Sequence, residues 1–176
     1  PQDVVEALSA TGFLRTAPDA SRPDFKTIKN VNGLNYYPTI DSQLQILTSG
    51  LMGITVKCAK CHDHPSVKEW KQAHYWGLYA YLKQTKQATN SRDKQVYFVE
   101  SLATGKIKFQ SVFEDNEEQT GPRLPGRPEV TIPTFEKGKE FDKPAEDGLP
   151  AVPRFRPREL LARDLPVKEN THFVHN

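Results

Sequence analysis

Cysteine is nearly absent from this chain of 176 residues: there are two, and both fall within one stretch of five residues. A structural zinc site usually repeats its C-x-x-C pair, and no third cysteine is present to complete one. Methionine is rarer still, with Met52 alone. The shortage of sulfur ligands therefore argues against structural zinc and concentrates attention on the one cysteine pair.

Apolar residues and long apolar runs are scarce as well. They make up 36% of the chain, against about 45–50% in a typical globular protein. No run approaches the roughly 18 apolar residues of a membrane-spanning helix, and no segment has the form of a signal peptide. We therefore expect a small core and no membrane span in this segment. Because the chain begins at Pro1 without an initiator methionine, the missing signal peptide says little about its destination.

A strong excess of charge is also lacking. The 24 basic and 22 acidic residues leave a net charge of +2, and the basic ones are scattered, which argues against binding to nucleic acid. No Ser/His/Asp order, phosphate-binding glycine loop or close pair of carboxylates indicates hydrolysis or phosphoryl transfer.

What the chain does contain is the stretch Cys58-Ala-Lys-Cys-His62. Two thiols three positions apart, followed at once by histidine, are typical of a c-type haem attachment site. The spacing lets two thioethers reach one porphyrin edge while the imidazole binds the iron. The alternatives are a C-x-x-C redox pair, a small disulfide or half a zinc site, although a thioredoxin-like pair calls for a βαβ context that the flanking sequence does not offer.

Two helical patterns flank this motif. Apolar residues recur at intervals of three and four between positions 40 and 54, which predicts an amphipathic helix leading into the cysteines. A second helix is predicted over residues 66–83, with Pro65 in its first turn and enough aromatic residues to form a wall beside a porphyrin or an ordinary core.

The remaining segments predict less regular structure. We expect a helix at residues 3–10, a long loop at 15–37, and a β-hairpin made by the β-rich runs 95–100 and 106–112. Nine of the fourteen prolines lie between Pro122 and Pro166, so the chain from residue 114 onward should be extended, with a short strand at 130–132 and a helix at 157–163.

These patterns predict a mainly α fold with a small β-hairpin and extensive irregular proline-rich segments, that is, a helical c-type haem domain. We expect residues 1–112 to form the haem-binding helical domain with the hairpin. Residues 113–176 should form an extended proline-rich tail.

Several strings resemble one known family. They are Ala10-Thr-Gly-Phe-Leu-Arg15, Gly53-Ile-Thr-Val-Lys-Cys-Ala-Lys-Cys-His-Asp-His-Pro65, the aromatic helix that follows, and Pro157-Arg-Glu-Leu-Leu-Ala162 with Asn170 and Phe173. In this order they resemble the planctomycete cytochrome-c-like family of large secreted bacterial proteins. The resemblance implies a haem c domain in the periplasm or outside the cell, and a chain that is a piece of something longer. It also implies that the tail of residues 113–176 is the junction to a missing second domain. It assigns no role to His74.

The candidate site follows from the motif. Cys58 and Cys61 would attach haem c covalently, and His62 would be the proximal iron ligand. Asp63 and His64 are expected to hold the iron ligand in place by hydrogen bonds without binding the iron, or to cap a helix. For the sixth position, His74 is a candidate distal ligand, with a packing role as the alternative.

Three further residues carry side chains that can bind the sixth position of a haem iron. Met52 lies too few residues before Cys58 to reach the far face of the iron easily, so we expect it in the core. His172 and His175 lie in a polar end of the chain, where chance explains them.

The leading hypothesis is a monohaem c-type cytochrome domain that transfers electrons to a redox partner protein outside the cytoplasm. The alternatives are a haem enzyme module with an open sixth site, peroxidase-like in character, and a structural module that bears a disulfide and mediates assembly.

Overall fold

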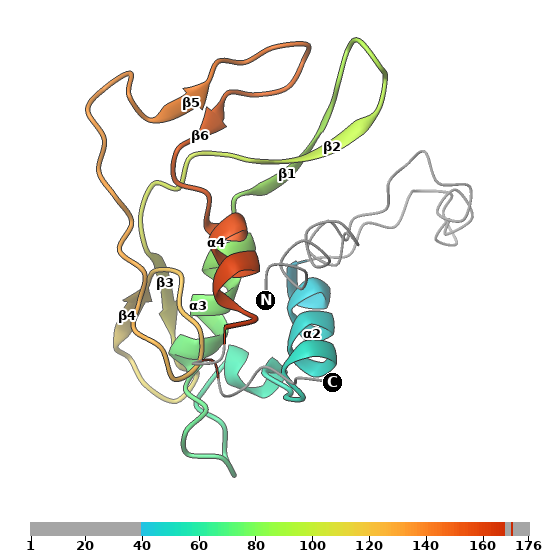
Figure 1. Cartoon of the computed structure of the whole chain (residues 1–176). Coiled ribbons are helices and arrows are strands. Elements are labelled where there is room, and N and C mark those ends of the chain that lie inside the picture. Colours follow the sequence, from blue (N-terminus) through green and yellow to red (C-terminus); the bar gives the residue numbers. More distant parts are fainter. Residues whose placement is uncertain (1–39, 168–169, 171–176) are drawn as a thin grey trace.

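The computed structural model of the chain describes residues 40–167 and residue 170 (Figure 1). Its helical elements are α2 (Ile40–Leu51), the 3₁₀ helix η1 (Lys57–Lys60), α3 (Gln72–Leu82) and α4 (Pro157–Asp164). Its strands are β1 (Thr85–Thr89), β2 (Val96–Glu100), β3 (Ile107–Gln110), β4 (Glu117–Thr120), β5 (Phe141–Lys143) and β6 (Val152–Pro153).

The prediction of a mainly α fold is wrong. Of the described residues, 27% are helical and 18% lie in strands, and the strands form three small antiparallel sheets. The result is a mixed α/β fold. The helix periodicity was visible in the sequence, but strands of two to five residues carry too few alternations to be recognised from pattern alone.

The predicted hairpin is also wrong in its pairing, although both of its strands exist. β2 pairs with β1, and β3 pairs with β4. A tight connection favours the first pair, because the Asn90 side chain accepts hydrogen bonds from the backbone N–H groups of Arg92 and Asp93 just after β1. The chain therefore reverses at Asn90, and β2 is already paired when it reaches residue 101.

The helices agree better with the sequence patterns. α2 and α4 occupy the predicted segments, and α4 begins at Pro157, where a missing N–H is no loss. α3 begins later than predicted, at Gln72. Residues 65–71 form turns instead, because the His64 Nδ1 accepts the N–H groups of Ser66 and Val67. None of the helices in the described ranges is long and apolar enough to cross a bilayer.

α3 is the centre of the molecule (Figure 1), and α2, η1, α4 and the β3–β4 sheet all contact it. Apolar side chains from these elements form one core: Leu44 and Leu47 of α2, Ala59 of η1, Leu78 and Tyr81 of α3, Leu161 of α4, and Met52, Val56, Leu124 and Leu165 from the connections. The expected packing of Met52 is confirmed, with 3% of the residue exposed. Burial raises the pKa of the Tyr81 hydroxyl, so it stays neutral in this core.

One glycine of α3 permits a close approach of the proline-rich chain. A Cβ atom on Gly77 would lie 2.7 Å from the Cβ of Arg123, and the Arg123 N–H donates to the Gly77 carbonyl at 3.1 Å. The backbone after β4 therefore lies directly against α3. Residues from both sides of position 112 contribute to the same core.

The end of the described chain is fixed by specific polar contacts. The Glu100 carboxylate accepts the Arg158 N–H in the first turn of α4 at 2.8 Å, and the Arg158 guanidinium lies over the Phe98 ring. The side chain of Asn170, which is buried, donates to the Leu165 carbonyl at 2.8 Å. These contacts join α4 to β2 and hold residue 170 against the end of α4.

One further prediction is wrong, and others fall outside the described residues. Residues 130–132 form no strand; the Val130 N–H donates instead to the Pro122 carbonyl at 2.7 Å. The predicted helix at 3–10, the loop at 15–37, His172 and His175 lie outside the described residues.

Candidate functional site

The two cysteines lie on a short turn that presents them outward. η1 carries Cys58, and Cys61 follows directly after its last residue. Ala59, between them, is buried in the core and donates its N–H to the Val56 carbonyl at 2.9 Å. The buried alanine fixes the inner side of the turn, so both thiols remain free and exposed at the surface.

The carbonyl of Lys60 is the main attachment point of this turn. It accepts hydrogen bonds from Gln72 Nε2 at 3.0 Å and from Trp76 Nε1 at 3.2 Å, both on α3. The Gln72 amide also donates to the Gln110 carbonyl at the end of β3. One buried glutamine therefore links the motif, α3 and β3.

The next carbonyl is held as well. The Cys61 carbonyl accepts the N–H of Val112 at 2.9 Å, from the loop between β3 and β4. β3 itself packs on α3, because the Trp76 ring stacks on Phe109 with centroids 6.2 Å apart and an interplanar angle of 14°. Because Cys61 is held through its backbone carbonyl, its thiol stays available on the outer face.

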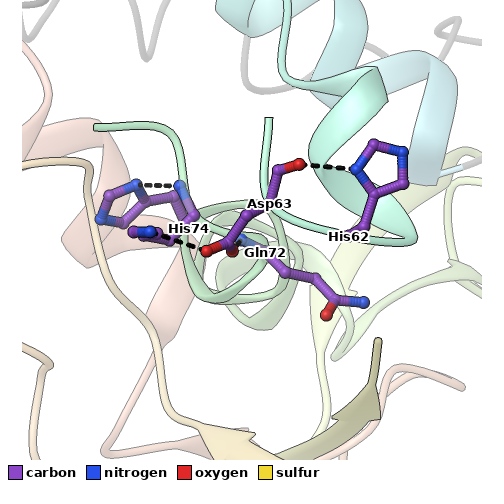
Figure 2. Close-up of polar contacts among 5 residues, drawn as sticks. His62, Asp63, Gln72 and His74 are labelled. Carbon is purple, nitrogen blue, oxygen red and sulfur yellow. Dashed lines mark hydrogen bonds and ion pairs between the residues drawn. The ribbon is translucent and has the colours of Figure 1, made fainter. Parts of the chain in front are cut away.

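His62 has a defined tautomer. Its Nδ1 lies 2.5 Å from the backbone carbonyl of Asp63 (Figure 2). A carbonyl oxygen can only accept, so Nδ1 carries the proton and the lone pair lies on Nε2. No hydrogen bond to Nε2 is made within the described part of the chain. This is the state in which a neutral imidazole can bind a metal through Nε2.

Asp63 caps α3 from outside the helix. Its Oδ1 accepts the Gln72 N–H at 2.8 Å, and its Oδ2 pairs with the Lys71 ammonium at 2.7 Å. Burial alone would raise the pKa of this carboxyl, but the hydrogen bonds from Lys71 and Gln72 outweigh it and leave the pKa lowered. Asp63 thus holds the start of α3 against the motif, while His64 caps the following turn.

His74 is buried, with 8% of the residue exposed, and lies in the first turn of α3. Its Nδ1 accepts the Lys71 N–H at 3.2 Å, and its ring meets Trp70 edge to face. In Figure 2 the rings of His74 and His62 lie on opposite sides of Asp63 and do not face each other. This placement corresponds to the packing alternative; ligation of iron by His74 stays a prediction.

A second polar cluster lies beside the motif. The Asp41 carboxylate, in the first turn of α2, pairs with the Lys60 ammonium at 2.6 Å and accepts the Tyr75 hydroxyl. The hydrogen bond from Lys60, then that from Tyr75, lowers the pKa of Asp41. Burial and the Asp41 charge raise the pKa of Tyr75. α2 is thereby joined to η1 and α3 around the cysteines.

An apolar feature completes the site. Val112 and Phe113 are 65% and 78% exposed, the most exposed large apolar side chains among the described residues. Phe113 lies against His62 with ring centroids 5.2 Å apart. His62 and Phe113 line an open hollow of about 730 Å³ that also reaches Asp63 and His74.

Sequence reasoning missed Gln72 and Phe113. Gln72 lies at a helix position where a polar residue is unremarkable, and its two carbonyl acceptors come from distant segments. Phe113 follows the β-rich run and gives no sign of its contact with His62. Only the three-dimensional arrangement shows these roles.

The side chains around the motif determine which metal group the site can hold. Within residues 40–167 and residue 170, no three His, Cys, Asp or Glu side chains gather to hold a metal ion. Two outward thiols and an imidazole with its Nε2 lone pair available match what covalent haem attachment requires, so the residues present fit that group.

Residues 1–87 match the family model described as PSCyt2, a protein of unknown function (DUF1549). The match supports a planctomycete-type domain of unknown function over these residues, including the motif. It does not extend to the 157–162 segment, where resemblance is also predicted. No curated protein matches the chain. No solved structure matches it either.

Proposed function

We propose that this chain is a monohaem c-type cytochrome domain that transfers single electrons to a redox partner protein outside the cytoplasm. Cys58 and Cys61 hold haem c through thioethers, and His62 is the proximal ligand. When bound, haem supplies a one-electron couple whose potential depends on its ligands and its burial.

One observation carries the proposal: the thiols and the His62 imidazole are presented together on a fixed outward turn. The Asp63 carbonyl selects the tautomer with a lone pair on Nε2. A backbone hydrogen bond to the opposite ring nitrogen is the usual support of a metal-bound histidine, since it fixes the ring and raises its basicity.

The surrounding chain supports attachment in a second way. The hydrogen bonds from Gln72, Trp76 and Val112 are made to backbone carbonyls of Lys60 and Cys61. They restrict the turn without occupying a thiol. Export follows from the same proposal, because covalent haem attachment of this type belongs to compartments outside the cytoplasm.

The decisive experiment is intact-mass measurement and reduced absorption spectroscopy of the chain, exported by a host that has a cytochrome c maturation system. The expected mass exceeds that of the polypeptide by one haem, and the reduced protein shows the α-band of haem c. Changing both Cys58 and Cys61 to serine should abolish covalent haem.

The matched control is the neighbouring histidine. His62→Ala should lose the proximal ligand and change the spectrum, whereas His64→Ala, which removes a turn cap, should keep the haem spectrum. A wild-type chain with the bare polypeptide mass and no α-band would overturn the proposal. A mass two hydrogens below that of the reduced polypeptide would favour the disulfide module instead.

A haem enzyme is the second candidate function. It is favoured by the positions of two residues that could otherwise fill the sixth position of the iron. Met52 is buried in the core, and His74 caps α3 away from His62. Carbon monoxide added to the reduced protein distinguishes the two functions. An unchanged six-coordinate spectrum is expected for electron transfer, and a carbon monoxide adduct would indicate an open site.

A further inference from the structure

We infer that Phe113 positions His62 for the iron and that Phe113 and Val112, at the start of the β3–β4 loop, form an apolar cover for the haem on the His62 side. This inference rests on the proposed function. It assigns a role to two residues outside the C-x-x-C-H pattern, and to the sheet that carries them.

Phe113 is unusually exposed for an aromatic side chain. A phenylalanine with 78% of its surface exposed has little of the burial that normally stabilises an aromatic side chain. A single exposed apolar residue needs no explanation, but two adjacent ones on a loop that is hydrogen-bonded to Cys61 form an apolar surface beside the motif. That surface lies where an apolar porphyrin would be attached.

Hydrogen bonds hold the β3–β4 loop that carries Val112 and Phe113. The Val112 N–H donates to the Cys61 carbonyl at 2.9 Å, so the backbone of the loop is fixed to the motif itself. The Phe113 N–H donates to the Ser111 hydroxyl, and the Gln110 side chain donates to the Glu114 carbonyl. The exposed ring is thus presented by an ordered turn.

Phe113 also contacts the His62 ring directly. The two ring centroids are 5.2 Å apart with planes tilted by 46°, which is within the range of favourable aromatic pairs. The Asp63 carbonyl fixes His62 through Nδ1, and Phe113 restricts rotation of the ring from the side. Together they fix both the tautomer and the plane of the imidazole.

The sheet explains why the loop is rigid. β3 and β4 pair from Ile107↔Thr120 to Gln110↔Glu117, and Lys108 pairs with Glu117 at 2.7 Å. Phe109 is buried and stacks on Trp76 of α3. The β3–β4 sheet, which carries Val112 and Phe113, is therefore packed on the same helix that holds the motif.

The test compares Phe113→Ala and Phe113→Leu with Phe141→Ala. Phe141 is the control, because it is an exposed phenylalanine on β5, at the opposite end of the molecule from η1 (Figure 1). The midpoint potential and the electron paramagnetic resonance spectrum of the ferric haem protein are measured for each. Both report on the ligand and its surroundings and not on folding alone.

Removing the ring admits water near the haem and favours the more highly charged ferric state, so the potential should fall. The expected fall in Phe113→Ala corresponds to about a tenfold change in the reduced-to-oxidised ratio, or about 59 mV for one electron. Phe113→Leu should fall less, and Phe141→Ala should not change. Equal potentials and unchanged resonance spectra in all variants would overturn the inference.

A second measurement separates this inference from the haem proposal. In the chain without haem, the ring current of Phe113 should shift the proton resonances of the His62 imidazole, and Phe113→Ala should remove that shift. If the shift is present but the wild type never carries haem, the contact is real and the proposed function fails, and the inferred role with it. If haem binds but the shift and the potential are insensitive to Phe113, only the inference fails.

Discussion

The motif turn at residues 57–64 and the proline-rich stretch at residues 122–156 both have little regular structure, yet they are held by different interactions. The turn is held mainly by side chains of α3 that donate to its backbone carbonyls. The proline-rich stretch is held by its own buried side chains, among them Leu124 and Phe155. A segment held by hydrogen bonds to its backbone keeps its side chains exposed for chemistry. A segment held by apolar packing has those side chains buried in the core.

The largest expected effect is on the apolar core into which the proline-rich stretch inserts Leu124. Leu161, in α4 directly after that stretch, is fully buried in the same core. Leu161→Ala should lower the free energy of unfolding by about 2–5 kcal/mol, because it removes buried methyl groups and leaves a cavity. Urea denaturation followed by circular dichroism measures the loss.

The adjacent Leu160 provides the control, since it is only partly buried against the same core. Leu160→Ala should cost clearly less than Leu161→Ala. Equal losses would contradict the placement of α4 described above.

An intermediate effect is expected on the polar side. Gln72→Ala removes one amide that donates to the carbonyls of Lys60 and Gln110. We expect the free energy of unfolding to fall by about 1–3 kcal/mol, since two partly buried carbonyls each lose a donor. The loss should be local: amide hydrogen exchange should increase most in residues 58–64 and 110–112.

Gln45→Ala is the matched change on the exposed surface of α2 and should leave exchange in those segments unchanged. If Gln72→Ala instead accelerates exchange uniformly along the chain, the motif turn is not anchored separately from the core, and the comparison above fails.

The smallest effect concerns the Asp41 ion pair. The Lys60 and Tyr75 hydrogen bonds lower the pKa of Asp41 in the folded chain. Its contribution to stability is therefore present above the ordinary carboxyl pKa and is lost as the pH falls through the lower folded value. Because the pair is about half exposed, we expect no more than about 1 kcal/mol.

Asp41→Asn should therefore flatten the dependence of stability on pH between about pH 2 and pH 6, measured by urea midpoints. Asp115→Asn, which changes an exposed carboxylate in the loop between β3 and β4, should keep the wild-type dependence. A variant at Asp41 with an unaltered acid limb would show that the ion pair contributes nothing in solution.

The local parts of the fold could be predicted from the sequence. The stripe from Ile40 identified α2, Pro157 marked the start of α4, and the short spacing of Met52 from Cys58 indicated a core residue. Each of these depends on neighbours within about one helical turn of the chain. Periodicity and capping preferences record such neighbours directly.

Non-local pairing could not be predicted in the same way. β2 and β3 were identified as strands, but their partners depend on the turn at Asn90 and on a fourth strand with little apolar alternation. α3 begins six residues late because the His64 ring stabilises a turn instead of a helix. The anchoring of the motif by Gln72 joins segments 12 and 38 residues apart, which no short pattern contains.

The Lys60 carbonyl, placed between the two cysteines, has one further consequence. It accepts two donors, and both come from α3, so the shape of the turn is encoded outside the five residues that carry its chemistry. A peptide copied from residues 58–62 would keep the thiols and the imidazole but lose their arrangement. The smallest unit that could be transplanted into another scaffold with this geometry intact is therefore the turn together with α3 and the β3–β4 hairpin, whose Val112 N–H holds the Cys61 carbonyl.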